Sequence, residues 1–147
     1  MEKLSKQPLV EVVFELHWES KEDYFDQGYK LIIGAFYEHI RDEFPVFDPL
    51  PTASIPEDVI PPDSGIVQYR FWSKGRDWPV VQLGPGILTV NMNKYYENWT
   101  TFKPIIEKVI GKFFSSYPNK EGLVVKKLIL KYIDFFQFDF SKSNVLD

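Results

Sequence analysis

The chain has 147 residues, of which 44% are hydrophobic, 26% charged and 17% aromatic, and its formal net charge is −4. A chain of this length and composition can bury a sizeable core, which excludes disorder throughout. The acidic balance argues against a nucleic-acid partner, since such partners are bound by neutralising phosphates.

Cysteine is absent, which excludes disulfides, thiol nucleophiles and thiolate metal sites. The first residues show no apolar run typical of a signal peptide, and no segment is apolar enough to span a bilayer. We therefore expect a cytoplasmic protein with no membrane contact.

Residues 9–18 alternate between apolar and polar side chains, which is typical of a half-buried strand. Ser20 is suited to cap a helix, and the apolar residues after it predict a helix of about 20 residues that ends before Pro45. The predicted apolar stripe of this helix consists of Phe25, Tyr29, Ile32, Phe36, Ile40 and Phe44.

Residues 45–65 are rich in proline, which predicts a long extended connection, either a functional loop or a stiff strap to the far edge of a sheet. Strands are predicted at residues 66–73, 79–83 and 87–93, with a tight turn at residues 84–86 between the last two. An apolar stripe predicts a second helix that begins near residues 99–101, and residues 123–140 predict a final strand.

The expected element order is therefore β-α-β-β-β-α-β. Because each helix has one apolar stripe, both helices should cover the same face of one sheet. We predict a single α+β domain over residues 1–147, a two-layer sandwich of a mostly antiparallel five-stranded sheet with two helices on one face.

Three short motifs are similar to those of a known family. Residues 8–16 read Pro-Leu-Val-Glu-Val-Val-Phe-Glu-Leu, residues 69–73 read Tyr-Arg-Phe-Trp-Ser, and residues 82–86 read Gln-Leu-Gly-Pro-Gly ahead of Val90, Asn91, Tyr96, Trp99 and Phe102. In combination they resemble a sporadically distributed bacterial family of uncharacterised proteins with an N-terminal PLVEVVFEL-type signature. Members of that family are longer, so the resemblance implies either the N-terminal part of a longer protein or a short member. It implies no established activity, catalytic residue or cofactor.

The sequence contains no phosphate-binding glycine loop, no nucleophile elbow and no His-Glu-x-x-His motif, and we expect no cofactor. Glu11, Glu15 and His17 share the polar side of the first strand, where they could bind a ligand or a divalent metal, or act as base and orienter. The alternative is that these residues form cross-strand pairs with Lys127 and Lys131 on the last strand.

Other polar residues are expected on the same face, opposite the helices. The candidate ligand-binding set is Glu11, Glu15, His17, Gln68, Arg70, Trp72 and Asn91, and Gln82, Thr89 and Asn93 are expected beside it. Arg70 is the best candidate for an anion contact, because its planar guanidinium can hold a carboxylate or phosphate with two hydrogen bonds. The alternative for Arg70 is an ordinary ion pair with Glu11 or Glu15. The face as a whole is expected to bind a ligand, to be covered by protein or to face solvent.

We expect a non-catalytic ligand- or protein-binding module that uses this face, with a protein partner or self-association, and with a small molecule as a further ligand. One alternative is a small-molecule enzyme with Glu15 or Glu11 as base, His17 as orienter and Arg70 as anion clamp. Another is an obligate oligomer subunit. A deep cavity that converges on Arg70 and Glu15 would favour the enzyme, and a flat or covered face would favour the module.

Overall fold

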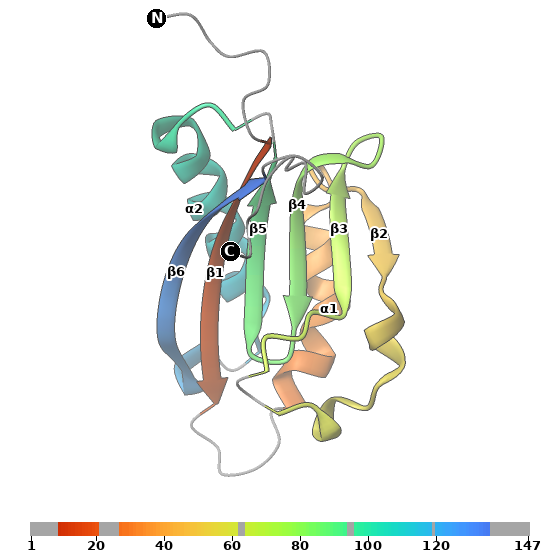
Figure 1. Cartoon of the computed structure of the whole chain (residues 1–147). Helices are drawn as coiled ribbons and strands as arrows, with labels where there is room; N and C mark the ends of the chain where they lie inside the picture. The colour runs from red at the N-terminus through yellow and green to blue at the C-terminus, as the bar shows by residue number, and fades with distance from the viewer. Residues whose placement is uncertain (1–8, 21–26, 62–63, 94–95, 119, 136–147) are drawn as a thin grey trace, which may run out of the picture.

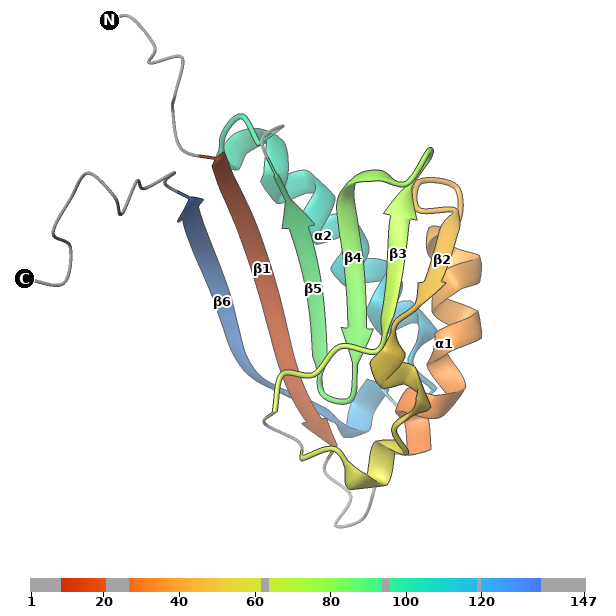
Figure 2. The same ribbon diagram turned by 45° about the vertical axis from the view of Figure 1, so that its right-hand side comes forward.

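A computed structural model describes residues 9–20, 27–61, 64–93, 96–118 and 120–135 of the chain. These residues form a six-stranded sheet in the order β2-β3-β4-β5-β1-β6, with all neighbouring strands antiparallel. Both helices lie on the same face of the sheet (Figures 1 and 2). The predicted two-layer α+β sandwich is confirmed, although the sheet has six strands where the sequence predicted five.

The elements have the following bounds. The strands are β1 Leu9–Ser20, β2 Val46–Pro49, β3 Tyr69–Ser73, β4 Asp77–Gly84, β5 Ile87–Met92 and β6 Leu123–Phe135. The helices are α1 Gln27–Ile40 and α2 Trp99–Ser116, with 3₁₀ turns at η1 Pro51–Ser54, η2 Glu57–Val59 and η3 Lys120–Gly122. Within the described ranges, no helix is both long and apolar enough to cross a membrane.

Strand β1 lies inside the sheet, between β5 and β6. Its alternation has the predicted effect: Val12, Phe14, Leu16 and Trp18 are buried in the core beneath the helices. Because successive strand residues point to opposite faces, Glu11, Glu15 and His17 lie on the other face. Phe14 is opposite Val90 of β5 and Leu130 of β6, so the apolar rows of the three strands are in register.

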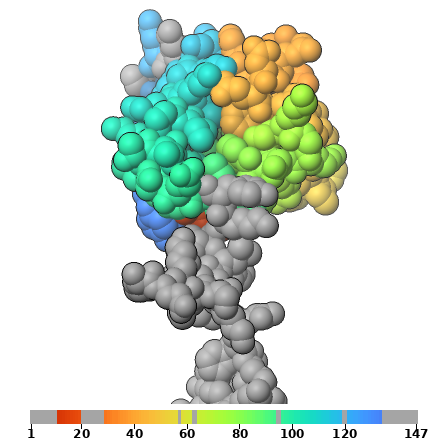
Figure 3. Space-filling view, turned by 90° about the horizontal axis from the view of Figure 1, so that it is seen from above, coloured from red at the N-terminus to blue at the C-terminus, as the bar shows by residue number. Residues whose placement is uncertain are grey.

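Helix α1 buries Tyr29, Ile32, Phe36 and Ile40 of the predicted apolar stripe. It has 14 residues and ends at Ile40, earlier than predicted, so Phe44 is buried from the turn that leads to β2. The Phe36 ring contacts Phe71 of β3 and Phe113 of α2, at centroid distances of 5.4 and 6.0 Å. Figure 3 shows α1 (orange) and α2 (teal) side by side. The predicted cap at Ser20 is wrong, since β1 continues through that residue. Residues 21–26, including Phe25, lie outside the described residues.

Helix α2 begins where the sequence predicts. The side chain of Asn98 accepts a hydrogen bond of 3.0 Å from the Thr101 amide, which satisfies one of the free donors of the first turn. The final strand ends the described part of the chain at residue 135, so the predicted continuation to residue 140 lies outside it.

The proline-rich segment contains a strand that the sequence did not predict. Val46–Pro49 pairs with β3 at the edge of the sheet, a position where a strand tolerates proline because its outer amides need no partner. The chain then turns through η1 and η2 and rejoins the sheet, where the Leu50 amide donates to the Gln68 carbonyl at 2.8 Å. This arrangement matches the stiff strap to the far edge of the sheet, and the segment between β2 and β3 is here named the strap.

The end of the strap crosses β4 so closely that it requires a glycine. A Cβ atom built on Gly84 would overlap the carbonyl oxygen of Ile66, which is backbone and has no freedom to rotate away. A Cβ atom built on Gly65 would lie 4.0 Å from the Ile87 side chain on β5, so the strap passes close to β5 as well. Since Leu83 faces the helices, this crossing lies on the opposite face of the sheet.

Candidate binding face

The face of the sheet opposite α1 and α2, here named the helix-free face, carries six of the seven predicted ligand-binding residues. They are Glu11, Glu15 and His17 of β1, Arg70 and Trp72 of β3, and Asn91 of β5. Each of them alternates with a residue of the buried core, such as Phe14, Phe71 or Val90. The strand alternation in the sequence was sufficient to place all six.

A hydrogen-bonded row of side chains, here named the polar chain, crosses four strands of this face. Arg70 Nε donates to Gln82 Oε1 at 2.7 Å, and Gln82 Nε2 donates to Thr89 Oγ1 at 3.2 Å. Thr89 Oγ1 donates to Asn91 Oδ1 at 2.7 Å, and Asn91 Nδ2 donates to Glu11 Oε2 at 2.9 Å. Gln82, Thr89 and Asn91 are buried, and these bonds offset the cost of removing their polar groups from water.

The register of the sheet produces the polar chain. Arg70 is directly opposite Gln82, Gln82 is opposite Thr89, and Thr89 is opposite Glu15. Side chains at opposite positions have Cβ atoms about 5 Å apart, which is within reach of a side-chain hydrogen bond. Gln82 and Thr89 therefore belong to the site, although neither was in the predicted ligand-binding set.

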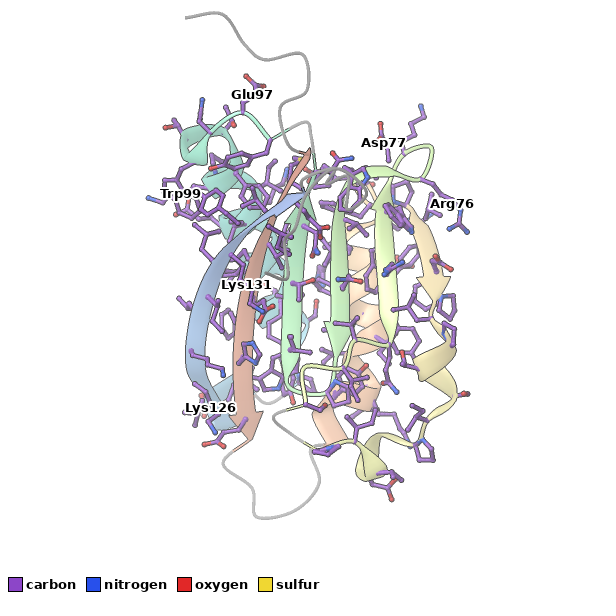
Figure 4. The ribbon with its side chains drawn as sticks, in the orientation of Figure 1. Arg76, Asp77, Glu97, Trp99, Lys126 and Lys131 are labelled. Atoms are coloured by element: carbon purple, nitrogen blue, oxygen red, sulfur yellow. The ribbon has the colours of Figure 1, made fainter. Side chains whose placement is uncertain are left out.

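Glu15 is the centre of a second polar group on the same face. Its Oε1 lies 2.8 Å from His17 Nε2, and its Oε2 lies 2.8 Å from Lys131 Nζ of β6. Figure 4 shows Lys131 beside β1 on this face. Burial raises the pKa of Glu15, but the hydrogen bonds and charges of Lys131 and His17 outweigh it and lower the pKa overall. The Glu15–Lys131 pair is one of the cross-strand pairs that the sequence offered as the alternative to a ligand site, whereas Glu11 bonds to Asn91.

Arg70 does not pair with either glutamate, so the predicted ion pair with Glu11 or Glu15 is wrong. Strands β4 and β5 lie between β3 and β1, which separates Arg70 from both glutamates by three inter-strand spacings of about 4.8 Å. Its guanidinium instead lies 5.9 Å from the ring centroid of Trp72, within the range of a cation–π contact.

The indole ring of Trp72 is itself held by a hydrogen bond to Asp48. Trp72 Nε1 donates to Asp48 Oδ2 at 3.3 Å, and Arg76 Nη1 donates to the same oxygen at 3.1 Å. The hydrogen bond from Arg76 is the largest of the effects that lower the pKa of Asp48. Asp48 and Arg76 were missed in the sequence, because Asp48 lies on the strand that the prolines conceal.

The terminal nitrogens of Arg70 make no hydrogen bond or ion pair within the part of the chain that the structure describes. Only Nε is engaged, by Gln82. The two Nη atoms are therefore free to form the paired hydrogen bonds with which a guanidinium holds a carboxylate. Arg70 and Trp72 are both only partly buried, so the guanidinium is accessible.

Gln68 does not join the helix-free face. Its Oε1 accepts a hydrogen bond of 2.8 Å from Tyr29 of α1, and its Nε2 donates to the carbonyls of Thr52 and Ile55 at 2.9 and 3.0 Å. Gln68 precedes β3, where strand alternation does not yet constrain the side chain. It therefore ties the strap to α1 beside a pocket of about 310 Å³, whose lining also includes Lys30 and Asp58.

No group of three or more metal-ligating side chains occurs within the described ranges. The other histidine, His39, has Nδ1 2.7 Å from the hydroxyl of Ser116. That hydroxyl donates to the Lys112 carbonyl at 2.7 Å, so it accepts from the imidazole and is not activated by it. The pair is a structural tie between α1 and α2.

The chain matches no protein-family model, and no curated protein or solved structure matches it. The resemblance to the bacterial family with the N-terminal signature therefore stays a prediction.

Proposed function

We propose that the protein is a non-catalytic ligand- or protein-binding module, and that its helix-free face captures the carboxylate group of its ligand through Arg70. The observation that carries this proposal is the state of the Arg70 side chain. Gln82 holds Nε, the Trp72 ring lies beside the guanidinium, and the two terminal nitrogens have no partner among the described residues. A guanidinium held in this way loses little conformational freedom when it binds.

The local charge favours an anion. Asp48 lies opposite Arg70, but Arg76 forms an ion pair with Asp48 and offsets its charge. The three side chains together carry one net positive charge. The Trp72 ring offers an apolar surface next to this charge, so a carboxylate attached to an apolar or aromatic group fits the site better than a bare anion.

The enzyme alternative has weaker support. Lys131 and His17 engage both oxygens of Glu15, and its pKa is lowered, whereas a general base works best with a pKa near the operating pH. Glu11 accepts from Asn91 within the polar chain. Bacterial origin and a cytoplasmic location remain predictions.

Isothermal titration calorimetry with benzoate, acetate and inorganic phosphate tests the proposal. We expect benzoate to bind more tightly than acetate or phosphate, and the Arg70→Gln variant to lose benzoate binding. The matched control is Arg41→Gln, which removes an exposed arginine of the α1 end that pairs with Glu38. Absence of benzoate binding, or equal binding by wild type and Arg70→Gln, would contradict the proposal.

A further inference from the structure

We propose that the outer edge of β6 pairs with β6 of a second copy of this chain, so that two sheets join edge to edge around a two-fold axis. Strand β6 is the last strand of the sheet and pairs only with β1 among the described residues. On its outer side, the backbone amides and carbonyls have no strand partner in the described part of the chain, and such a row is a template for another strand.

The side chains of β6 are unusually apolar for an exposed edge. Ten large hydrophobic side chains are exposed in the described part of the chain, and five of them lie on β6. They are Val125, Leu128, Leu130, Tyr132 and Ile133, with exposed fractions between 37% and 59%. Leu128, Leu130 and Tyr132 lie opposite the core residues Leu16, Phe14 and Val12, so they extend one apolar row to the edge of the sheet. An exposed apolar row of this kind marks an interaction surface.

Charged residues often protect edge strands, and β6 carries three lysines, Lys126, Lys127 and Lys131, of which two have an acidic partner on β1. Lys131 Nζ lies 2.8 Å from Glu15, and Lys126 Nζ lies 3.5 Å from Glu19, so acids of the neighbouring strand β1 compensate both charges. The opposite edge of the sheet differs. Strand β2 has four residues, ends in Pro49 and continues directly into the strap.

A second copy is the occupant because the strand is complementary to itself. In the antiparallel register that places Leu130 opposite Leu130 of the copy, Leu128 lies opposite Tyr132. Each lysine then lies opposite an isoleucine: Lys127 opposite Ile133 and Lys131 opposite Ile129. A register centred on Ile129 would instead oppose Lys127 to Lys131 twice, and one centred on Lys131 would oppose that lysine to itself, both of which like-charge repulsion disfavours.

The geometry of β6 suits this register. Leu130 is the middle residue of the stretch from Lys127 to Ile133. This stretch pairs with β1 without irregularity, since the register shift occurs beyond it, at His17/Trp18. Tyr132 is further positioned by a hydroxyl contact of 3.1 Å with Tyr96, and the ring of Tyr96 packs on Phe102 of α2. A two-fold pairing of identical strands closes the assembly as a dimer.

Cysteine cross-linking tests the register directly, because the chain has no cysteine of its own. Leu130→Cys should form a covalent dimer on mild oxidation, since directly opposite residues in an antiparallel pair have Cα atoms about 4.5–5.5 Å apart, within disulfide range. Leu128→Cys and Tyr132→Cys are matched controls and should not cross-link alone, because each would lie about 13 Å from its own copy. Mixing these two variants should restore the cross-link.

Sedimentation of the whole chain provides the second measurement. The wild type should be a dimer at high micromolar concentration, and Leu130→Lys should be a monomer because it opposes two lysines at the axis. Leu31→Lys, which changes a highly exposed leucine on α1, should leave the dimer intact. A monomeric wild type would overturn the proposal, as would cross-linking of Leu128→Cys alone in place of Leu130→Cys.

Discussion

On the face of the sheet that the helices cover, large apolar side chains such as Phe36, Phe71 and Phe113 are fully buried and contact one another through their rings. On the helix-free face, the buried side chains at the centre include Gln82, Thr89 and Asn91, which bond to each other in a defined order. The energy of apolar packing depends on the volume and shape of the side chains, whereas the energy of a hydrogen-bonded row depends on the direction of each donor and acceptor. The helix-covered face therefore contributes most of the free energy of unfolding. The helix-free face contributes less, and its hydrogen bonds fix the positions of its polar side chains.

The largest expected effect lies in the core. Phe36→Ala should lower the free energy of unfolding by about 3–5 kcal/mol, because it removes a fully buried ring and leaves a cavity between α1, α2 and β3. Urea unfolding followed by circular dichroism measures this loss. Leu31→Ala, an exposed site on the same helix, is the control and should change the unfolding energy little.

The crossing of the strap over β4 is the place where the helix-free face is packed as tightly as the core. Gly84→Ala should destabilise by about 1–3 kcal/mol, because the added methyl group overlaps the Ile66 backbone. Gly34→Ala on α1 meets no neighbouring atom within 4 Å, so the same change there should stabilise by about 0.5–1 kcal/mol. Thermal unfolding of the two variants in parallel should give shifts of opposite sign, and shifts of equal sign would contradict the packing at the strap.

The comparison also shows which features of the molecule local sequence can predict. The alternation of β1, the apolar stripes of α1 and α2 and the turn after Gly84 reflect side-chain periodicity and backbone conformation, and the structure confirms each of them. Strand β2 was missed because four residues among prolines carry too short a pattern.

The partners of Arg70 depend on strand order, which is set by contacts distant in sequence. Arg70 of β3 and Glu15 of β1 lie on the same face and in the same cross-strand row. Only the strand order shows that β4 and β5 lie between them. The sequence could therefore name the face and its residues, while the order of the polar chain required the structure.

Breaking the polar chain at its middle should cost less than either change above. Thr89→Val keeps the branched shape of the side chain but removes the hydroxyl that joins Gln82 to Asn91, and it should destabilise by about 1 kcal/mol. Urea unfolding measures the loss. If Thr89→Val were as damaging as Phe36→Ala, the distinction between the two faces would fail.

The smallest expected effect concerns Glu15 and is measured from the dependence of stability on pH. The pKa of Glu15 is lowered in the folded protein, so its interactions with Lys131 and His17 stabilise fully above its ordinary pKa of 4.5. That stabilisation is lost as the pH falls through the lower folded-state value. Urea midpoints measured across this acidic range should therefore decline less steeply for Glu15→Gln than for wild type.

Lys131→Met offers an independent check of the same group. It removes the largest of the effects that lower the Glu15 pKa, so it should also flatten the acid dependence of the urea midpoint. Parallel curves for wild type and both variants would show that this group does not contribute to stability as its geometry indicates.

The most direct test of the account is nitrogen-15 NMR of the arginine side chains during a titration with benzoate. The chain has only Arg41, Arg70 and Arg76, so their Nε–H signals can be assigned by substitution. We predict that the Arg70 signal exchanges slowly with water, because Gln82 accepts its proton, and that benzoate shifts it while the Arg41 signal stays in place. An Arg70 signal that exchanges as fast as that of Arg41 and does not move with benzoate would contradict the central role of the helix-free face.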